Sequence, residues 1–364
     1  MFSNETCLEC SKLVRFFDSL VKPACAKTFR RALTGCICVL SLSCIVSAQL
    51  TRPPVEQIRT AFLNDLSLAK TGNRQAQLRV GRAYYNGTGV VLNYSQAVRW
   101  LHAASAQGSI EADAWLGSCY IFGRGITDDV VKGSAMIRKA AEANNPVGLR
   151  FLAIMYETGL GVQQNRAKAL SLFTQSANLN DARSFVRLGN MYRHGTGEEQ
   201  DLNKARQLFQ KGAELGDDWA QLNLADMYRG GEGSGNAPDY GMALKLYTQS
   251  AGRGNRIAAF RLAKMYELGR GTPADAWNAL QYYKISAERG YIPAELALAG
   301  LHEKQGSPVD MVFAYALYSV AANQGNLAAN EHLSSLNSIL SQDQIRQGKA
   351  LMARWAMRIR DDNQ

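Results

Sequence analysis

Histidine, cysteine and paired carboxylates are the side chains whose types and spacing could support metal binding or acid–base catalysis. The four histidines stand far apart, without the short spacing of paired metal ligands: His102, His194, His302 and His332. Cys7 and Cys10 form a Cys-x-x-Cys pair, but no second pair and no nearby histidine completes a zinc or redox site. Acidic pairs such as Glu198-Glu199 stand at expected turns or helix starts, where they complement the helix dipole. The sequence therefore predicts no catalytic centre, no metal and no cofactor.

A recurring row of arginine, aromatic and amide residues is the better candidate for function, and its chemistry would be binding. Within each unit two of its positions are three residues apart, which places them on one face of a helix. Arginine and tryptophan are enriched in binding hot spots. The alternative is that Trp115 and Phe151 pack between neighbouring helices, and periodicity alone does not separate the two readings. The row consists of Arg79, Arg82, Trp115, Phe151, Arg187, Asn190, Asn223, Asp226, Arg261 and Lys264.

The elements that position this row form a repeat. Six tyrosines come into register when the chain is slid along itself, at intervals of 36, 36, 36, 36 and 38 residues: Tyr84, Tyr120, Tyr156, Tyr192, Tyr228 and Tyr266. In the unit Ser184–Gly216, a first apolar stripe predicts helix A, and Gly195 and Gly197 predict the tight turn after it. A second stripe around Leu208 and Phe209 predicts helix B.

Such helix pairs bury their apolar faces only by stacking, so we expect an all-α solenoid of antiparallel helix pairs. One unit carries most of the pattern A-x-x-x-L-G-x-x-Y-x-x-G-x-G, then K-A, then K-A-A-x-x-G, in the residues Ala112, Leu116, Gly117, Tyr120, Gly123, Gly125, Lys132, Lys139, Ala140 and Ala141. Gly133 and Asn144 stand where the last two motifs have alanine and glycine. This pattern resembles the Sel-1-like repeat, a longer-looped relative of the 34-residue tetratricopeptide repeat. The resemblance covers seven units over residues 76–325 and implies a right-handed superhelix whose A helices line a concave groove.

The resemblance also implies a function. Bacterial Sel-1-like proteins are exported adaptors, so we expect a non-enzymatic scaffold that binds a protein or peptide partner of the cell envelope along the concave face. A cell-wall or exopolysaccharide-binding factor that uses the same arginine and tryptophan face is the alternative. Some relatives are described as cysteine-rich β-lactamases with a disulfide in each repeat. Because only Cys119 follows the first 48 residues, that hydrolase function is the least favoured.

Residues 1–48 have the features of a secretory signal peptide. Arg30 and Arg31 precede the uncharged run 32–46, and Val46-Ser47-Ala48 places small residues at the cleavage positions. The run is short for a membrane span, which needs about 20 residues, so cleavage after Ala48 is favoured over a retained anchor. We therefore expect export, most simply to the periplasm, with membrane attachment only if the segment is retained.

The ends of the array should be closed by capping helices. Residues 49–75 read as a polar linker followed by a capping helix that resembles a helix B, and residues 326–364 as C-terminal capping helices. Ser341-Gln342-Asp343-Gln344 is a capping box that opens the last of these. Of the chain's net charge of +10, the first 48 residues hold +3, and the remaining +7 favours acidic partners or an anionic polysaccharide. No motif resembles a nucleic-acid-binding module, so we expect no nucleic acid partner.

Overall fold

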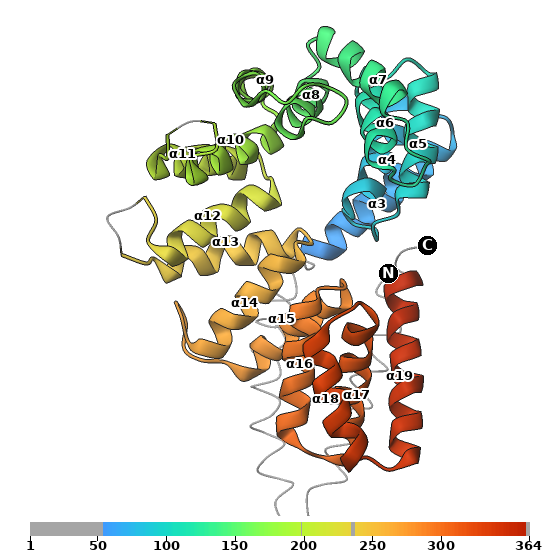
Figure 1. Ribbon diagram of the computed structural model, residues 1–364, viewed down its shortest axis with the longest axis vertical. Helices are drawn as coiled ribbons and strands as arrows, with labels where there is room; N and C mark the ends of the chain where they lie inside the picture. Colours follow the sequence, from blue (N-terminus) through green and yellow to red (C-terminus); the bar gives the residue numbers. More distant parts are fainter. Residues whose placement is uncertain (1–53, 198, 234–236, 362–364) are drawn as a thin grey trace, which may run out of the picture. The chain divides into compact units, whose positions relative to one another are not determined.

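The structure, a computed structural model, describes residues 54–361 except 198 and 234–236. This part of the chain consists of helices, α3 to α19, without a strand, which confirms the all-α fold class (Figure 1). None of these helices is long and apolar enough to cross a membrane. The predicted signal peptide and most of the polar linker, residues 1–53, lie outside the described residues.

The helices alternate between an A and a B helix in seven consecutive pairs. The A helices are α4 (Arg74–Asn86), α6 (Ile110–Phe122), α8 (Pro146–Thr158), α10 (Ala182–His194), α12 (Asp218–Gly230), α14 (Arg256–Leu268) and α16 (Ile292–Gln305). The B helices are α5 (Tyr94–Ala106), α7 (Val130–Glu142), α9 (Arg166–Asn178), α11 (Leu202–Glu214), α13 (Tyr240–Gly252), α15 (Ala276–Glu288) and α17 (Pro308–Asn323). The capping helices are α3 (Pro54–Lys70), α18 (Leu327–Ile339) and α19 (Gln342–Asp361).

Polar N-cap residues start almost every A and B helix. In α4 the Asn73 side chain accepts a hydrogen bond from the Ala76 N–H, and in α5 Asn93 does the same for Gln96. A capping side chain satisfies one of the backbone donors that a helix start leaves without a partner. The A helices begin two residues before the expected repeat units, as α4 does at Arg74 against residue 76 and α10 at Ala182 against Ser184. Tyr291, before α16, is the exception and makes no side-chain cap bond.

The Gly-x-Gly turns have the conformation that the sequence predicted. The first glycine ends helix A with a positive φ, as at Gly123, where φ is 60°. The second glycine contacts the preceding unit: a Cβ at Gly125, where φ is 71°, would lie 2.3 Å from the carbonyl carbon of Tyr94. Only glycine allows this approach, so the turn fixes how one helix pair meets the start of the previous helix B.

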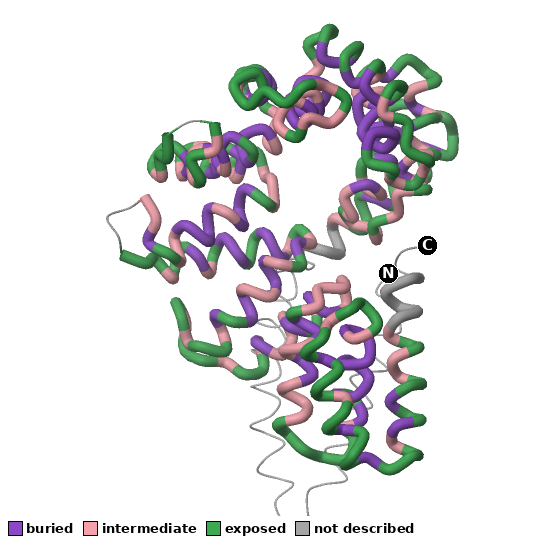
Figure 2. The backbone as a smooth tube through the Cα atoms, viewed as in Figure 1, coloured by how far each residue is buried: buried purple, intermediate pink, exposed green. Residues whose placement is uncertain are grey.

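Small residues also set the distance between A and B helices. A Cβ on Gly117 in α6 would lie 2.9 Å from the Gly133 carbonyl oxygen in α7. Larger buried side chains fill the remaining space within a pair, as Phe209 of α11 does beside Gly189 of α10. Each helix packs mainly on its neighbours in sequence, and α6 also contacts α8 as α10 contacts α12. The buried residues therefore follow the stack of helix pairs (Figure 2).

The last described helices complete the C-terminal end. The turn before α17 is short, since α16 ends at Gln305 and α17 begins at Pro308. The predicted capping box is present, because the Ser341 N–H donates to the Gln344 side chain and the Gln344 N–H donates to Ser341 Oγ, at 2.9 and 3.3 Å. Helix α19 then packs along α17 and contacts α15.

Candidate functional site

The predicted row lies where neighbouring A helices meet, and three of its cations form ion pairs across that boundary. These pairs join α4 to α6, α8 to α10, and α12 to α14. The N–O distances are 3.0 Å for Arg82–Glu111, 3.6 Å for Arg187–Glu157 and 3.2 Å for Arg261–Asp226. The structure therefore brings row residues into contact with carboxylates of a neighbouring A helix.

The other two cations of the row are paired as well. Arg79 binds the carboxylate of Asp65 in α3 through Nε and Nη2, with the shortest contact at 2.7 Å. The Lys264 ammonium lies 3.0 Å from Glu267 one turn along α14. Burial opposes ionisation of Glu267, but hydrogen bonds from Tyr283 and Lys264 outweigh it and lower the pKa of this carboxyl.

Pairing does not remove these cations from solvent. Their side chains are between 37% exposed, at Arg261, and 48% exposed, at Arg187. Ion pairs with this exposure contribute only about 0–1 kcal/mol, because water screens them and two side chains must be held in place. A guanidinium has five N–H donors, so one carboxylate leaves donors free for another acceptor. The cations of the row are thus paired with carboxylates and still present hydrogen-bond donors to solvent.

The aromatic residues of the row do not lie on an accessible surface. Trp115 and Phe151 are each only 4% exposed, and their rings meet edge to face between α6 and α8. Of the two readings that the sequence left open, the structure supports packing for this pair. We therefore correct their assignment from partner-binding residues to core residues, because the space between these two A helices encloses them.

The remaining polar residues of the row differ in how far they are buried. Asp226 is 9% exposed, accepts a hydrogen bond from Tyr247 and pairs with Arg261. It is therefore a buried link within the stack, and its place on an open face is corrected. Asn190 is half-buried on α10. Asn223 is half-buried on α12 and donates to the Trp219 carbonyl at 2.8 Å.

Sequence reasoning missed a buried ion pair next to the aromatic core. Arg150 Nε lies 2.9 Å from the carboxylate of Asp181, and both side chains are about nine-tenths buried. The Arg150 guanidinium lies 5.1 Å from the Trp115 ring centroid and 4.5 Å from that of Phe151. The signal was a charged residue at a position of the A helix that is leucine or valine at Leu78, Leu222 and Val186.

Histidine and cysteine residues form no catalytic cluster in the described part of the chain. His302 contacts Asp310 at 2.8 Å and His332 contacts Glu303 at 3.1 Å, and each pair is separate from the other. No group of three potential ligands that could hold a metal ion occurs among the described residues. Cys119 is buried, as expected from its place in helix A, and burial raises the pKa of its thiol to about 12.

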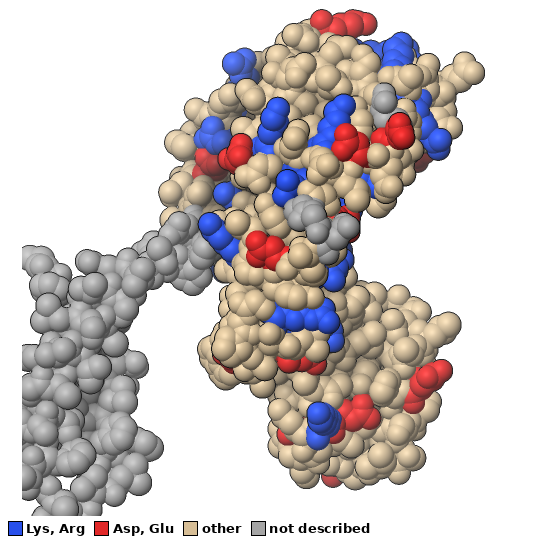
Figure 3. Space-filling view, turned by 90° about the vertical axis from the view of Figure 1, so that its left-hand side faces the viewer, with Lys and Arg blue, Asp and Glu red and all other residues tan. Residues whose placement is uncertain are grey.

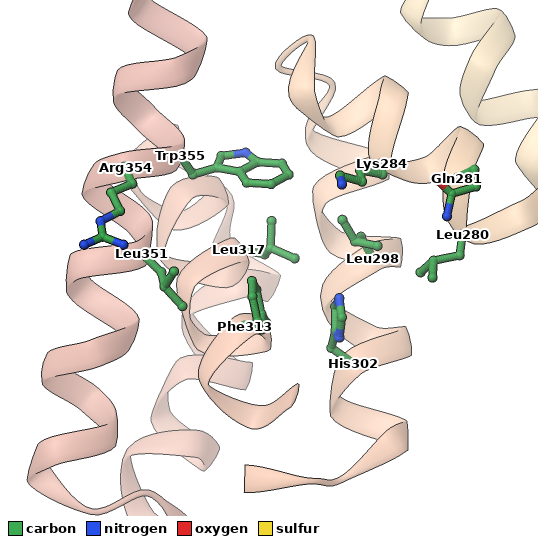
Figure 4. A pocket seen from close by; sticks show the side chains of 10 residues that line it. All are labelled: Leu280, Gln281, Lys284, Leu298, His302, Phe313, Leu317, Leu351, Arg354 and Trp355. Carbon is green, nitrogen blue, oxygen red and sulfur yellow. The ribbon is translucent and has the colours of Figure 1, made fainter. Parts of the chain in front are cut away.

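A cavity of about 490 Å³ lies under the C-terminal helix. Helices α15, α16, α17 and α19 supply its walls, as Figure 4 shows. Its lining residues are Leu280, Gln281, Lys284, Leu298, His302, Phe313, Leu317, Leu351, Arg354 and Trp355. No sequence pattern predicts this cavity, because it forms only where α19 packs across the last helix pairs.

Comparison with known proteins agrees with the repeat structure. The model of the Sel1 repeat matches residues 74–109, 110–145, 146–181, 186–217, 220–255, 256–291 and 292–326. An uncharacterized protein of Neisseria meningitidis serogroup B is 39% identical over 67 residues, which are 18% of this chain and 14% of that protein. The chain thus spans about a seventh of the length of that relative.

Two solved structures are similar in part. The crystal structure of a Sel1 repeat protein from Oxalobacter formigenes is 30% identical with a TM-score of 0.47, over 65% of this chain and 97% of that one. A protective antigen of uropathogenic Escherichia coli that displays an SLR fold is 25% identical with a TM-score of 0.46, over 83% of this chain and 80% of that one. Since seven matched repeats cover more than half of its residues, this chain belongs to the Sel1 repeat family.

Proposed function

We propose that this protein is an exported, non-enzymatic adaptor that binds an extended segment of a partner protein along the accessible part of the helix A row. Sel1 repeats generally form scaffolds that bind proteins or peptides. The observation that carries the proposal is the geometry of Arg79, Arg82 and Arg187. Each is held by one carboxylate while 44–48% of its side chain stays exposed.

Held arginines suit a peptide because they bind its acceptors at a low entropic cost. A side chain that is already ordered loses less rotamer freedom when a partner arrives. The carbonyl and carboxylate oxygens of an extended peptide can contact the guanidinium donors that the internal ion pairs leave free. The accessible cations lie on α4, α10 and α14, so an extended segment would contact the row at intervals along the stack.

The distribution of charge favours a protein over an anionic polysaccharide. On the face that Figure 3 shows, basic and acidic side chains are interspersed among uncharged ones. The row itself pairs its cations with Asp65, Glu111 and Glu157. A polyanion would be repelled by these carboxylates, whereas a protein segment can present groups of both signs.

Export is part of the proposal and rests on the sequence of residues 1–48. The apolar run and the Val46-Ser47-Ala48 ending support cleavage after Ala48. N-terminal sequencing of the protein from the producing cell tests this directly. A mature chain that begins at Gln49 supports secretion, and a chain that retains residues 32–46 points to a membrane anchor.

Site-specific photo-crosslinking tests the binding surface. A photoreactive amino acid at Asn190, on helix α10, should give a cross-linked adduct in the cell that expresses the protein. The same group at Thr174, exposed on helix α9, is the matched control on a B helix. We expect adducts at Asn190 and none at Thr174. Adducts at Thr174 alone would place the partner on the opposite layer of helices and overturn the proposal.

A further inference from the structure

The cavity under α19 has a largely apolar wall. Leu298 and Leu317, only 4% and 3% exposed, line its base from α16 and α17. Phe313 is 39% exposed although it is a large aromatic residue that lines the cavity. Pockets for small ligands typically have volumes of about 300–1,000 Å³ and similar apolar walls. The volume and lining of this cavity match that class.

The charged side chains that line the cavity are hydrogen-bond donors. Lys284 and Arg354 are cationic, and no carboxylate belongs to the lining. The Trp355 indole Nε1 is buried and has no hydrogen-bond partner in the structure. In Figure 4 Lys284 and Trp355 extend into the cavity from opposite walls, α15 and α19. A buried donor without an acceptor is costly, so a ligand oxygen at this place would remove a penalty.

The other polar residues of the wall are compatible with the same ligand. His302 contacts Asp310 through Nδ1 and stacks on Phe313, with ring centroids 5.4 Å apart. The Asp310 carboxylate is thereby engaged and is not part of the cavity lining. Gln281, next to Lys284 on α15, adds an uncharged amide at the wall. Within the lining, the net charge is therefore positive.

From this combination we propose that the cavity binds an apolar monocarboxylate. The carboxylate lies at Lys284 and the Trp355 indole N–H, and the apolar body lies against Phe313, Leu298 and Leu317. A charge-assisted hydrogen bond from the ammonium and the neutral indole donor would hold the two carboxylate oxygens. Two sources have this chemistry: a free fatty acid, and the last residue of a peptide that ends in an apolar side chain. The site is separate from the helix A row and does not depend on the function proposed there.

Calorimetric titration of the full chain with four probes tests the chemistry. Decanoate represents the free acid, and acetyl-Ala-Ala-Leu with a free carboxylate represents a chain end. Decanol and the C-terminal amide of the same peptide are their neutral counterparts. We expect at least one carboxylate to bind about tenfold or more tightly than its neutral counterpart, since a hydrogen bond to a charged group is stronger than one to a neutral group. The carboxylate that binds identifies the source.

Two substitutions locate the binding site. Lys284→Met removes the ammonium but keeps an apolar stem, and should weaken carboxylate binding about tenfold or more. Trp355→Phe removes only the indole N–H and the second ring, and should weaken it by a smaller factor. Lys349→Met is the matched control, because Lys349 is exposed on α19 and does not line the cavity. Thermal melts of each variant show whether α19 still packs.

The proposal is overturned by any of three results. The first is that neither carboxylate binds the folded wild-type protein. The second is that the neutral counterparts bind equally well. The third is that Lys284→Met and Lys349→Met both bind with the affinity of the wild type. Because Lys284 is exposed, its replacement is not expected to unfold the chain.

Discussion

The rings of Trp115 and Phe151 meet edge to face between helices α6 and α8, with their centroids 5.2 Å apart and an interplanar angle of 81°. Edge-to-face pairs of this kind add about 0.5–1.5 kcal/mol to the free energy gained from burial. Arg150 completes the cluster over both rings and pairs with Asp181. This cluster shows that equivalent positions of the repeat serve packing in some units and carry accessible cations in others.

We expect Trp115→Ala to destabilise the protein by about 3–5 kcal/mol, because it empties a closed site in the core. Urea denaturation followed by circular dichroism measures this change. Trp277→Ala is the control, since Trp277 is 68% exposed and its loss should change stability by at most about 0.5 kcal/mol. Equal, small losses for both variants would mean that Trp115 is accessible after all.

Arg150→Ala should be strongly destabilising, by about 3–5 kcal/mol, because it leaves the Asp181 carboxylate buried without its partner. Asp181 also caps α10, so its own replacement would add the loss of a cap. The double variant Arg150→Met/Asp181→Asn keeps shape and a cap acceptor without burying a charge, and should recover part of the stability. A double variant less stable than Arg150→Ala would show that the pair is favourable beyond its desolvation cost.

Glu295 should make the stability of the seventh repeat depend on pH. Burial raises the pKa of this carboxyl from 4.5 to about 7, although Gln324 donates a hydrogen bond to it at 3.2 Å. Between these two pH values the folded protein keeps a proton that the unfolded chain has lost. The free energy of unfolding should therefore fall as the pH rises from 4.5 to 7 and then level off, by about 1.4 kcal/mol for each unit of pKa shift.

Comparison with Glu295→Gln isolates this effect from other titrating groups. The amide cannot ionise, so the variant should lose less stability than the wild type between pH 4.5 and 7. Glu142→Gln is the matched control, because Glu142 is exposed at the end of α7. If the free energy of unfolding depends on pH in the same way for wild type and Glu295→Gln, Glu295 ionises without cost in the folded state.

Gly125→Ala should be more destabilising than Gly108→Ala. Both glycines have positive φ, 71° and 80°, so both alanines pay the conformational cost of about 1–2 kcal/mol. Only at Gly125 does the new Cβ meet backbone atoms, 2.3 Å from the Tyr94 carbonyl carbon, while nothing lies within 4 Å at Gly108. Overpacking adds about 1–3 kcal/mol. Equal melting temperatures for the two variants would mean that the turns do not fix the contact between units.

The repeat made most of the fold predictable from the sequence. The tyrosine register and the Gly-x-Gly turns located the helix pairs, because backbone conformation at Gly123 or Gly195 depends on the residue itself. The exact helix starts were missed by two residues, although an Asn, Asp or Ser before each A helix up to Asn255 was the available signal.

The site was less predictable, because exposure depends on what the neighbouring helix presents. Trp115 and Arg187 occupy the same position of the repeat, yet one is enclosed by Phe151 and the other is half-exposed beside Glu157. Spacing within one helix contains no information on that difference. The cavity at Lys284 depends in addition on how α19 packs, which no periodic pattern describes.

One affinity comparison shows whether the accessible cations of the helix A row bind the partner. The partner identified by cross-linking at Asn190 is titrated against the wild type, Arg79→Gln/Arg82→Gln/Arg187→Gln, and Arg59→Gln/Arg99→Gln/Arg166→Gln. The second triple variant removes equal charge from exposed positions on α3, α5 and α9. We expect the row variant alone to lose about tenfold or more in affinity, with stability changed by at most about 1 kcal/mol per ion pair. Equal affinity for all three proteins, or equal loss in both variants, would contradict it.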